Sequence, residues 1–348
     1  MAPRSKKPEK IALLLQGGGA LGAYQAGIYA ALAKAGHRPD WIAGISIGAI
    51  NAAIIAGNPR GRVTERLHDF WMRVSSSVTP FPFVEELMET TFNQTAAATT
   101  LMFGAPGFFT PRLSPPFTRP CADPADLSYY DSADLRRTLE DLVDFDLIND
   151  RRNPDRIRLS VGAVGVMNGN FEYFDSDKQK IRPEHIMASG ALPPGLPPVQ
   201  AQCKDGHVDW FWDGGLVSNT PLQYVIDEEG PDDLLAFQVD LFPARGPMPR
   251  NLFDVEERQK DIRFSSRTRL GTDMIKRRQE VAAAAARLAA RYPEIKDDPD
   301  IALIEAHAVL GATTIVHFIY KRKYTDGFAK DYEFSRATIK AHWPAGED

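Results

Sequence analysis

The chain has 348 residues, of which 43% are hydrophobic and 25% are charged, as is ordinary for a globular protein with one large domain or a core domain plus a smaller one. Its formal net charge of −5 at pH 7 argues against a general nucleic-acid binder, whose surface would be basic overall. Two cysteines, Cys121 and Cys203, would make one disulfide at most, so the chain does not resemble a disulfide-stapled secreted domain, and we expect a cytoplasmic protein. The apolar run 11–15 is too short for a signal peptide, and no run reaches the roughly 18 residues of a transmembrane helix.

The first part of the chain alternates between strand and helix patterns. A buried strand is expected over 11–15, a glycine-rich loop over 16–22 and a helix over 23–35. A second strand over 41–43 leads through a turn into a helix of small residues over 49–56. This order predicts a parallel sheet with covering helices, and therefore an α/β fold.

The segment 74–128 is different, because it is rich in proline, phenylalanine and threonine. Its prolines forbid long regular elements, and its aromatic side chains need a cover. Two interpretations stay open. The segment is either an elaborate loop packed on the core or a lid that forms an acyl-binding wall over an active site and touches membrane.

The remaining elements are predicted from capping residues, helical periodicity and β-branched or aromatic runs. The expected helices are 131–139, 183–189, 272–291 and 330–343, and the expected strands are 156–164, 171–174, 209–212, 233–241 and 313–320. We interpret 11–243 as one domain. Residues 244–348 begin with a proline-rich linker and form a C-terminal accessory region that extends the sheet or packs on it.

The turn from Gly44 to Gly48 joins the second strand to its helix and has the pattern G-x-S-x-G. A serine at such a turn stands exposed at the carboxyl edge of the sheet, and the two glycines permit the sharp bend and the close approach of a carbonyl group. The helix that follows points the positive end of its dipole at the place where an oxyanion would form. Ser46 is therefore a candidate nucleophile.

The earlier glycine loop satisfies G-x-G-x-x-G through Gly17, Gly19 and Gly22, which permits two interpretations. One is the dinucleotide-binding loop of a nicotinamide-dependent oxidoreductase, whose acidic residue would be Asp40. Asp40 precedes the second strand, however, whereas the ribose-binding acid belongs at the carboxyl end of that strand. The other is an anion-binding nest of backbone N–H groups that faces the same crevice as Ser46 and is suited to acyl transfer.

A serine nucleophile needs a base. None of the seven histidines stands in the order Ser, Asp, His of an α/β-hydrolase, and His185 and His207 are the ones to test for a triad. Asp213 ends an expected strand and precedes Gly214 and Gly215, although this sequence alone also makes an ordinary turn. No cluster of histidine and cysteine suggests a metal.

The blocks taken together resemble those of the patatin-like phospholipases in order and spacing. They are Gln16 to Gly22, Gly44 to Gly48, Ala188 to Pro193 and Asp213 to Gly215, within roughly residues 11 to 240. The residues after 243 resemble the C-terminal extension of a bacterial subset of that family. The resemblance implies a three-layer α/β/α fold with a mostly parallel sheet, and an enzyme that hydrolyses lipid carboxylic esters without a cofactor.

The resemblance also implies roles for individual residues. They are Ser46 as the nucleophile, Asp213 as the general base without a histidine, and Gly17, Gly18 and Gly19 at the oxyanion hole. One departure is Leu21, where the family's glycine block often carries Arg or Lys. A cation there would help to hold an anionic head group or the oxyanion, so its absence bears on phospholipid preference.

The expected partner is a lipid or acyl-ester substrate, with peripheral membrane contact and no nucleic acid. A third interpretation is a non-catalytic protein of the membrane surface. It rests on the basic runs 276–278 and 321–323, which are also typical of solvated faces.

Overall fold

The computed structural model describes residues 10–75, 100, 102–114, 123–229, 233–295, 298–306, 313–321 and 331–348. Cys121, His307 and most of the segment 74–128 lie outside these residues, as does most of the basic run 321–323. Within the described residues, Cys203 is a buried free cysteine. Among the described helices, none is both long enough and apolar enough to cross a membrane.

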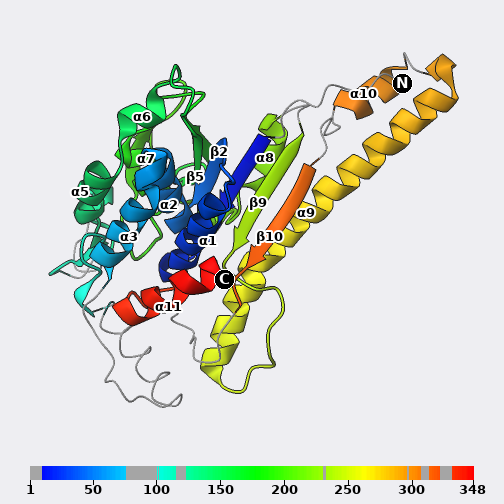
Figure 1. Cartoon of the computed structure of the whole chain (residues 1–348). Helices are drawn as coiled ribbons and strands as arrows, with labels where there is room; N and C mark the ends of the chain where they lie inside the picture. Colours follow the sequence, from blue (N-terminus) through cyan, green and yellow to red (C-terminus); the bar gives the residue numbers. More distant parts are fainter. Residues whose placement is uncertain are drawn as a thin grey trace.

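An eight-stranded sheet forms the centre of the molecule (Figure 1). Its strands are β1 (Lys10–Leu15), β2 (Trp41–Ile45), β5 (Arg158–Gly165), β6 (Phe171–Asp175), β7 (Val199–Gln202), β8 (Val208–Asp213), β9 (Leu234–Asp240) and β10 (Thr313–Ile319). They follow the order β10-β9-β1-β2-β5-β8-β7, and β6 also pairs with β5. The five strands from β10 to β5 are parallel, whereas β6, β7 and β8 pair in antiparallel fashion. The predicted mostly parallel sheet is confirmed.

Helices surround this sheet, and a small pair of strands lies apart from it. The helices are α1 (Gly22–Lys34), α2 (Ile47–Ala56), α3 (Val63–Val74), α5 (Ala133–Leu142), α6 (Phe145–Asn149), α7 (Pro183–Ser189), α8 (Leu222–Glu229), α9 (Leu252–Arg291), α10 (Pro299–Ala306) and α11 (Arg336–Glu347). Short 3₁₀ turns occur at Gly19–Leu21, Arg60–Arg62, Pro124–Asp126, Gly214–Leu216 and Pro293–Ile295. The separate pair is β3 (Thr110–Pro111) with β4 (Tyr130–Asp131).

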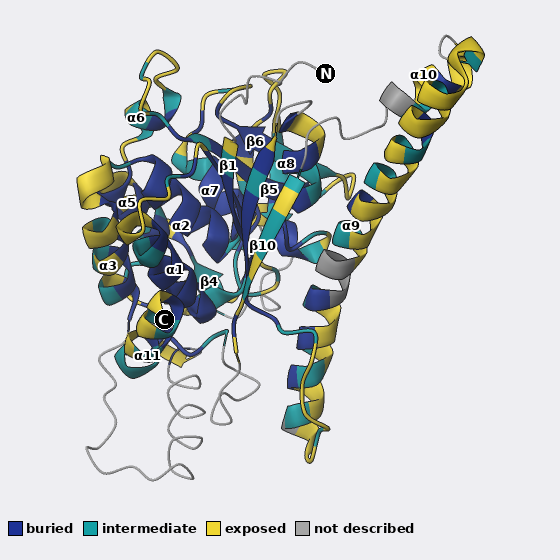
Figure 2. Ribbon diagram, turned by 45° about the vertical axis from the view of Figure 1, so that its right-hand side comes forward, coloured by how far each residue is buried: buried dark blue, intermediate teal, exposed yellow. Residues whose placement is uncertain are grey.

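The alternation of side chains along the strands produces the three layers. Leu13 and Leu15 of β1 belong to the large core shared with α1, α2, α3 and α7. Ala12 and Leu14, which point the other way, belong to a smaller core with α8 and α9. Buried residues of the sheet are seen between these helices in Figure 2. The α/β/α architecture is confirmed.

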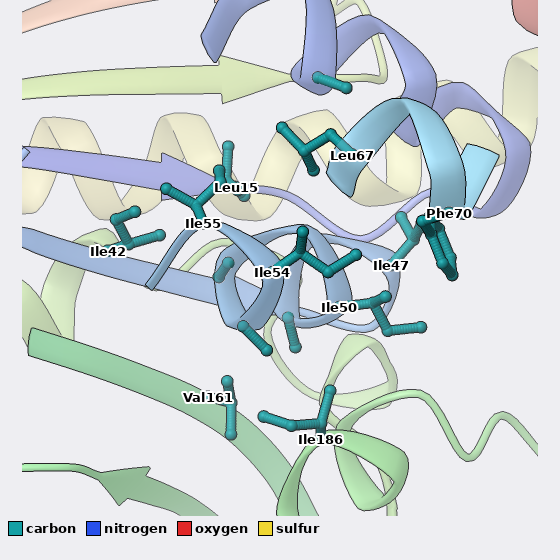
Figure 3. Packing of buried hydrophobic residues seen from close by; sticks show 14 of the residues in the cluster. Leu15, Ile42, Ile47, Ile50, Ile54, Ile55, Leu67, Phe70, Val161 and Ile186 are labelled. Atoms are coloured by element: carbon teal, nitrogen blue, oxygen red, sulfur yellow. The ribbon is translucent and has the colours of Figure 1, made fainter. Parts of the chain in front are cut away.

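Helix α2 lies deep in the large core. All of its residues are buried, and Ile50 and Ile54 lie between the strands and the neighbouring helices (Figure 3). Burial of each isoleucine side chain stabilises the fold by about 1.5–3 kcal/mol. Because α2 starts immediately after Ser46, this packing fixes the position of the predicted nucleophile.

The predicted boundary of the long helix 272–291 was wrong, because α9 already begins at Leu252. Asn251 caps its first turn by accepting a hydrogen bond from the N–H of Asp254 at 3.0 Å. The inner face of the first half is polar, with Glu257 and Asp261 buried, so the apolar periodicity that marks an amphipathic helix is missing there.

The last helix also differs from its prediction. It runs from Arg336 to Glu347 rather than over 330–343. The side chain of Ser335 caps its first turn by accepting a hydrogen bond from the N–H of Thr338, so the helix begins after this serine.

The C-terminal region both extends the sheet and packs on it. Strand β10 continues the sheet beside β9, and α11 lies against α1. The two helices approach so closely that a Cβ on Gly27 would lie 2.1 Å from the carbonyl oxygen of Trp343. A domain boundary at residue 243 stays a prediction.

Candidate active site

The turn between β2 and α2 holds Ser46 in a conformation that side chains rarely adopt. Its φ is 55° and its ψ is −124°, and within the described residues no other non-glycine residue has a positive φ. Such a backbone costs on the order of 1–3 kcal/mol and persists only where surrounding packing imposes it. A strained serine between a strand and a helix has the geometry of a nucleophile elbow.

The glycines on either side of Ser46 are required by close backbone contacts. A Cβ on Gly44 would lie 2.3 Å from the carbonyl oxygen of Gly48, and a Cβ on Gly48 would lie 2.3 Å from that of Leu15. Neither glycine lines the pocket described below. They let the helix start directly above the strands and thereby set the direction of the serine side chain.

Asp213 is the last residue of β8 and is only 2% exposed. Its carboxyl group accepts a hydrogen bond, 2.7 Å long, from the N–H of Gly215, and it lies beside the side chain of Ser46, which favours its ionised form. Burial raises the pKa of Asp213 to about 6, and the neighbouring Ser46 side chain and Gly215 N–H oppose this rise. The two predicted catalytic side chains, from distant parts of the chain, are therefore neighbours at one pocket.

A pocket of about 380 Å³ opens over this pair. From the glycine loop and the strand ends it is lined by Gly17, Gly18, Gly19, Ser46, Asp213, Gly215 and Asn219. Apolar side chains make up much of the rest, among them Phe108 and Phe109 from the described part of the segment 74–128. These two phenylalanines are also buried in the large core. Both interpretations of the segment, a loop packed on the core and a wall of the pocket, therefore fit these two residues.

The backbone amides of the glycine loop differ in whether they are already hydrogen-bonded. The N–H of Gly17 donates to the carbonyl oxygen of Asn219 at 3.4 Å, and that of Ala20 donates to the carbonyl oxygen of Asp331 at 3.0 Å. In the described part of the chain, the N–H groups of Gly18 and Gly19 donate to no turn, loop or cap carbonyl. Both residues line the pocket, so these N–H groups are the candidates to bind an oxyanion there.

Two further predicted glycines, besides Gly44 and Gly48, do not line the pocket. Gly22 is the first residue of α1, where a Cβ would lie 2.7 Å from Ile47 and 3.0 Å from Trp71, so its role is helix packing. Gly214 faces β5, where a Cβ would lie 2.6 Å from the carbonyl oxygen of Gly162.

Ser189 supports the elbow, a role that the sequence did not reveal. Its Oγ accepts a hydrogen bond from the N–H of Ser46 at 3.0 Å and donates one to the carbonyl oxygen of Gly162 at 2.7 Å. The side chain is fully buried at the end of α7. It lies in the block Ala188 to Pro193, so the family resemblance was the one available signal.

Asn219 was not predicted either. Its side-chain Nδ2 donates to the carbonyl oxygen of Gly17 at 2.9 Å, and its own carbonyl accepts the Gly17 N–H. This buried asparagine holds the glycine loop against the segment that follows Asp213. The polar run Ser218 to Thr220 carries no pattern that marks this role.

The residues of the alternative interpretations lie elsewhere. Asp40 accepts a hydrogen bond from the N–H of Ile11 at 2.9 Å, which places it at the amino ends of the strands, opposite the glycine loop. His207 pairs with Asp205 in an exposed turn, and His185 is buried against the carbonyl oxygen of Gln202. Within the described residues, no histidine lines the pocket.

The C-terminal region completes the pocket, which the sequence did not predict. Its contribution comes from α9 and from the segment before α11, namely Lys260, Arg263, Phe264, Asp331, Tyr332 and Phe334. Burial raises the pKa of the Tyr332 hydroxyl above its ordinary value, and the charges of Asp331 and Asp213 add to this rise.

Comparison with known proteins identifies the family. A family model described as patatin-like phospholipase matches residues 13–226, more than half of the chain, and one described as patatin phospholipase matches residues 262–348. Among curated protein sequences, none matches this chain. The crystal structure of VipD from Legionella pneumophila aligns with 97% of this chain and 67% of its own, at 13% sequence identity and a TM-score of 0.35. The resemblance predicted from the motifs is confirmed, and the chain belongs to the patatin-like phospholipase family, whose members are lipid ester hydrolases.

Proposed function

We propose that this protein is a serine acyl hydrolase that cleaves lipid carboxylic esters through a Ser46–Asp213 dyad and an acyl-enzyme. The observation that carries the proposal is that the Ser46 side chain and the buried Asp213 carboxyl are neighbours at one pocket, which Gly18 and Gly19 also line. A nucleophile, a base and oxyanion donors around one point are the requirements of acyl transfer.

In the first half of the reaction, Asp213 accepts the proton of the Ser46 hydroxyl while Oγ attacks the ester carbonyl carbon. The negative charge moves to the carbonyl oxygen, where the Gly18 and Gly19 N–H groups stabilise it by about 3 kcal/mol per donor. The tetrahedral intermediate collapses and the carbon–oxygen bond to the alcohol breaks. Asp213 returns its proton to the departing alkoxide, and the acyl group remains on Ser46.

In the second half, water takes the place of the alcohol. Asp213 removes a proton from water, the hydroxide attacks the acyl carbon, and the same donors hold the oxyanion. Collapse releases the carboxylic acid and returns the proton to Ser46. A base with a pKa of about 6 is ionised at neutral pH and is still basic enough to share a proton with an attacking hydroxyl.

The aromatic part of the pocket supports a long acyl chain as the substrate group. Phe109 lies 4.8 Å from Tyr130 and 6.3 Å from Phe334 between ring centroids, and Phe108 lies 5.7 Å from Phe334. These rings give a continuous apolar wall beside Ser46, and burial of each methylene contributes about 0.8 kcal/mol. Peripheral contact with a membrane and a cytoplasmic location stay predictions.

The experiment is hydrolysis of a monoacylglycerol, followed by mass spectrometry of the released fatty acid. The variants Ser46→Ala and Asp213→Asn are compared with Ser218→Ala, which removes a serine from the loop after Asp213 that does not line the pocket. We expect release of fatty acid by wild type and Ser218→Ala and its loss in both dyad variants. Full activity in Ser46→Ala would contradict the proposal.

A further inference from the structure

Among the residues that the structure describes, the cationic side chains that line the pocket come from the wall added by the C-terminal region. Lys260 and Arg263 lie one turn apart on α9, and both line the pocket. Residue 21 is a leucine, and its uncharged side chain is fully buried in the core, so it contributes no charge to the pocket. Within the described part of the chain, the cationic partners for an anion in the pocket therefore lie on α9.

The two cations are not equivalent. The Nζ of Lys260 donates to both carboxylate oxygens of Asp331, at 2.8 and 3.0 Å, so the charge of this acid is compensated. Arg263 is exposed at the pocket, and its guanidinium carbon lies 5.8 Å from the centroid of the Phe264 ring. Among the described residues, no carboxylate forms an ion pair with Arg263.

Several contacts fix α9 in this position. The ring of Phe264 packs on Phe242 with centroids 4.7 Å apart, and a Cβ on Gly18 would lie 3.3 Å from that Phe242 ring. Arg258 donates to the carbonyl oxygen of Ala244 at 2.6 Å. The α9 wall is thus linked to the glycine loop through Phe242, and Arg263 lines the same pocket as Gly18 and Gly19.

The segment before α11 closes the wall from the other end. The carbonyl oxygen of Asp331 accepts the Ala20 N–H, and a Cβ on Gly19 would lie 2.0 Å from that oxygen. Lys260 lies 4.9 Å above the ring of Tyr332. Because α9, this segment and the glycine loop are tied together, the cationic part of the pocket is formed before any substrate arrives.

We propose that Arg263 forms a subsite for a phosphate group carried by the alcohol part of the acyl ester. The proposal rests on the proposed function and adds to it the class of substrate. The apolar rings around Phe109 and Phe334 take the acyl chain, whereas the exposed guanidinium takes the charged end of the alcohol. A guanidinium pairs with phosphate through two parallel N–H···O bonds, and Arg263 has its donors available for them.

The test compares two short-chain substrates that differ only in the phosphate, an octanoyl glycerol phosphate and the octanoyl monoacylglycerol. Wild type is measured beside Arg263→Ala, Arg263→Lys and Arg277→Ala, the last being an exposed arginine on the same helix away from the pocket. We expect Arg263→Ala to raise the ratio of KM for the phosphate ester to KM for the neutral ester about tenfold or more. Arg263→Lys should restore part of the loss, and Arg277→Ala should behave as wild type.

The remaining outcomes are also informative. Equal losses on both substrates, or no loss on the phosphate ester, would overturn the subsite while leaving the hydrolase intact. Inhibition of neutral-ester hydrolysis by inorganic phosphate that depends on Arg263, without a preference for the phosphate ester, would assign the subsite to the free ion and overturn the proposal. Failure of wild type on both esters would instead count against the proposed function itself.

Discussion

The backbone N–H of Ser46 donates a hydrogen bond to the Oγ of Ser189, 3.0 Å away. The Oγ of Ser189 in turn donates a hydrogen bond to the carbonyl oxygen of Gly162 in β5. The buried Ser189 hydroxyl therefore links the strained turn to the sheet. The proposed nucleophile is therefore positioned by a side chain that does not reach the substrate pocket.

Replacement of Ser189 by alanine should impair catalysis more than its cost in stability explains. The change leaves the Ser46 N–H and the Gly162 carbonyl without this partner, which costs about 1–3 kcal/mol, and it frees the elbow to move. We expect kcat to fall by about 10–100-fold, since displacement of a reacting group by about 1 Å can cost that much.

The control for this variant is Ser160→Ala. Ser160 is also fully buried, accepts a hydrogen bond from Trp41 at 2.9 Å and donates one to Asp175 at 2.9 Å, but it is away from the pocket. The two variants should lose similar stability by thermal unfolding. Equal kcat values in the two variants would contradict a positioning role for Ser189.

The activity should depend on pH through Asp213. The carboxyl must be ionised to accept the Ser46 proton, and burial raises its pKa to about 6. We therefore expect kcat/KM to be constant above about pH 7 and to fall about tenfold per pH unit well below pH 6. A pH profile with a neutral ester measures this, and an acid limb centred near pH 4 would contradict the buried base.

The same carboxyl should make the fold less stable at neutral pH. The pKa is higher in the folded protein than in the unfolded chain, where it is about 3.9, so stability is greatest below pH 4 and falls as the pH rises from about 4 to about 6. Asp213→Asn keeps the acceptor for the Gly215 N–H and removes the charge. We expect it to unfold at a higher temperature than wild type at pH 8, by an amount that corresponds to at most about 3 kcal/mol.

The difference between these two proteins should shrink as the pH falls from 6 to 4, because wild-type Asp213 becomes neutral. Thermal unfolding at pH 4, 6 and 8 measures it. A variant that is less stable than wild type at pH 8 would show that the ionised carboxyl stabilises the fold, which is the opposite of what its burial and raised pKa predict.

Gly48 should tolerate no side chain. A Cβ there would lie 2.3 Å from the carbonyl oxygen of Leu15, so Gly48→Ala has to displace α2 from the strands. We expect a loss of at least about 2 kcal/mol in the free energy of unfolding. In Gly61→Ala the new Cβ meets nothing within 4 Å, so this variant should unfold as wild type does.

Much of this fold could be predicted from the sequence, because buried parallel strands and small-residue helices have strong local patterns. Strand β1 and helix α7 lie where they were expected. The start of α9 was missed because its inner face buries Glu257 and Asp261, which read as solvated residues. Burial of a charged side chain depends on partners far along the chain, and no local pattern records them.

The residues of the candidate site also fall into those that the sequence predicts and those that it does not. Ser46 and the glycine loop could be found because their backbone geometry demands glycines at fixed spacing. Asn219 and Ser189 act through single hydrogen bonds to backbone atoms, which many polar residues make. The wall that contains Arg263 forms only because α9 packs against the sheet, and the sequence does not show this packing. From the sequence alone, the basic residues of this helix are equally typical of a solvated face.

The most direct test of the Ser46–Asp213 dyad is covalent labelling by a fluorophosphonate probe, with the modified peptide identified by mass spectrometry. A fluorophosphonate reacts with a serine that is activated by a neighbouring base. We predict one modified residue, Ser46, in wild type, and a much slower reaction in Asp213→Asn. Modification of another serine, or equal rates in the two proteins, would contradict the dyad.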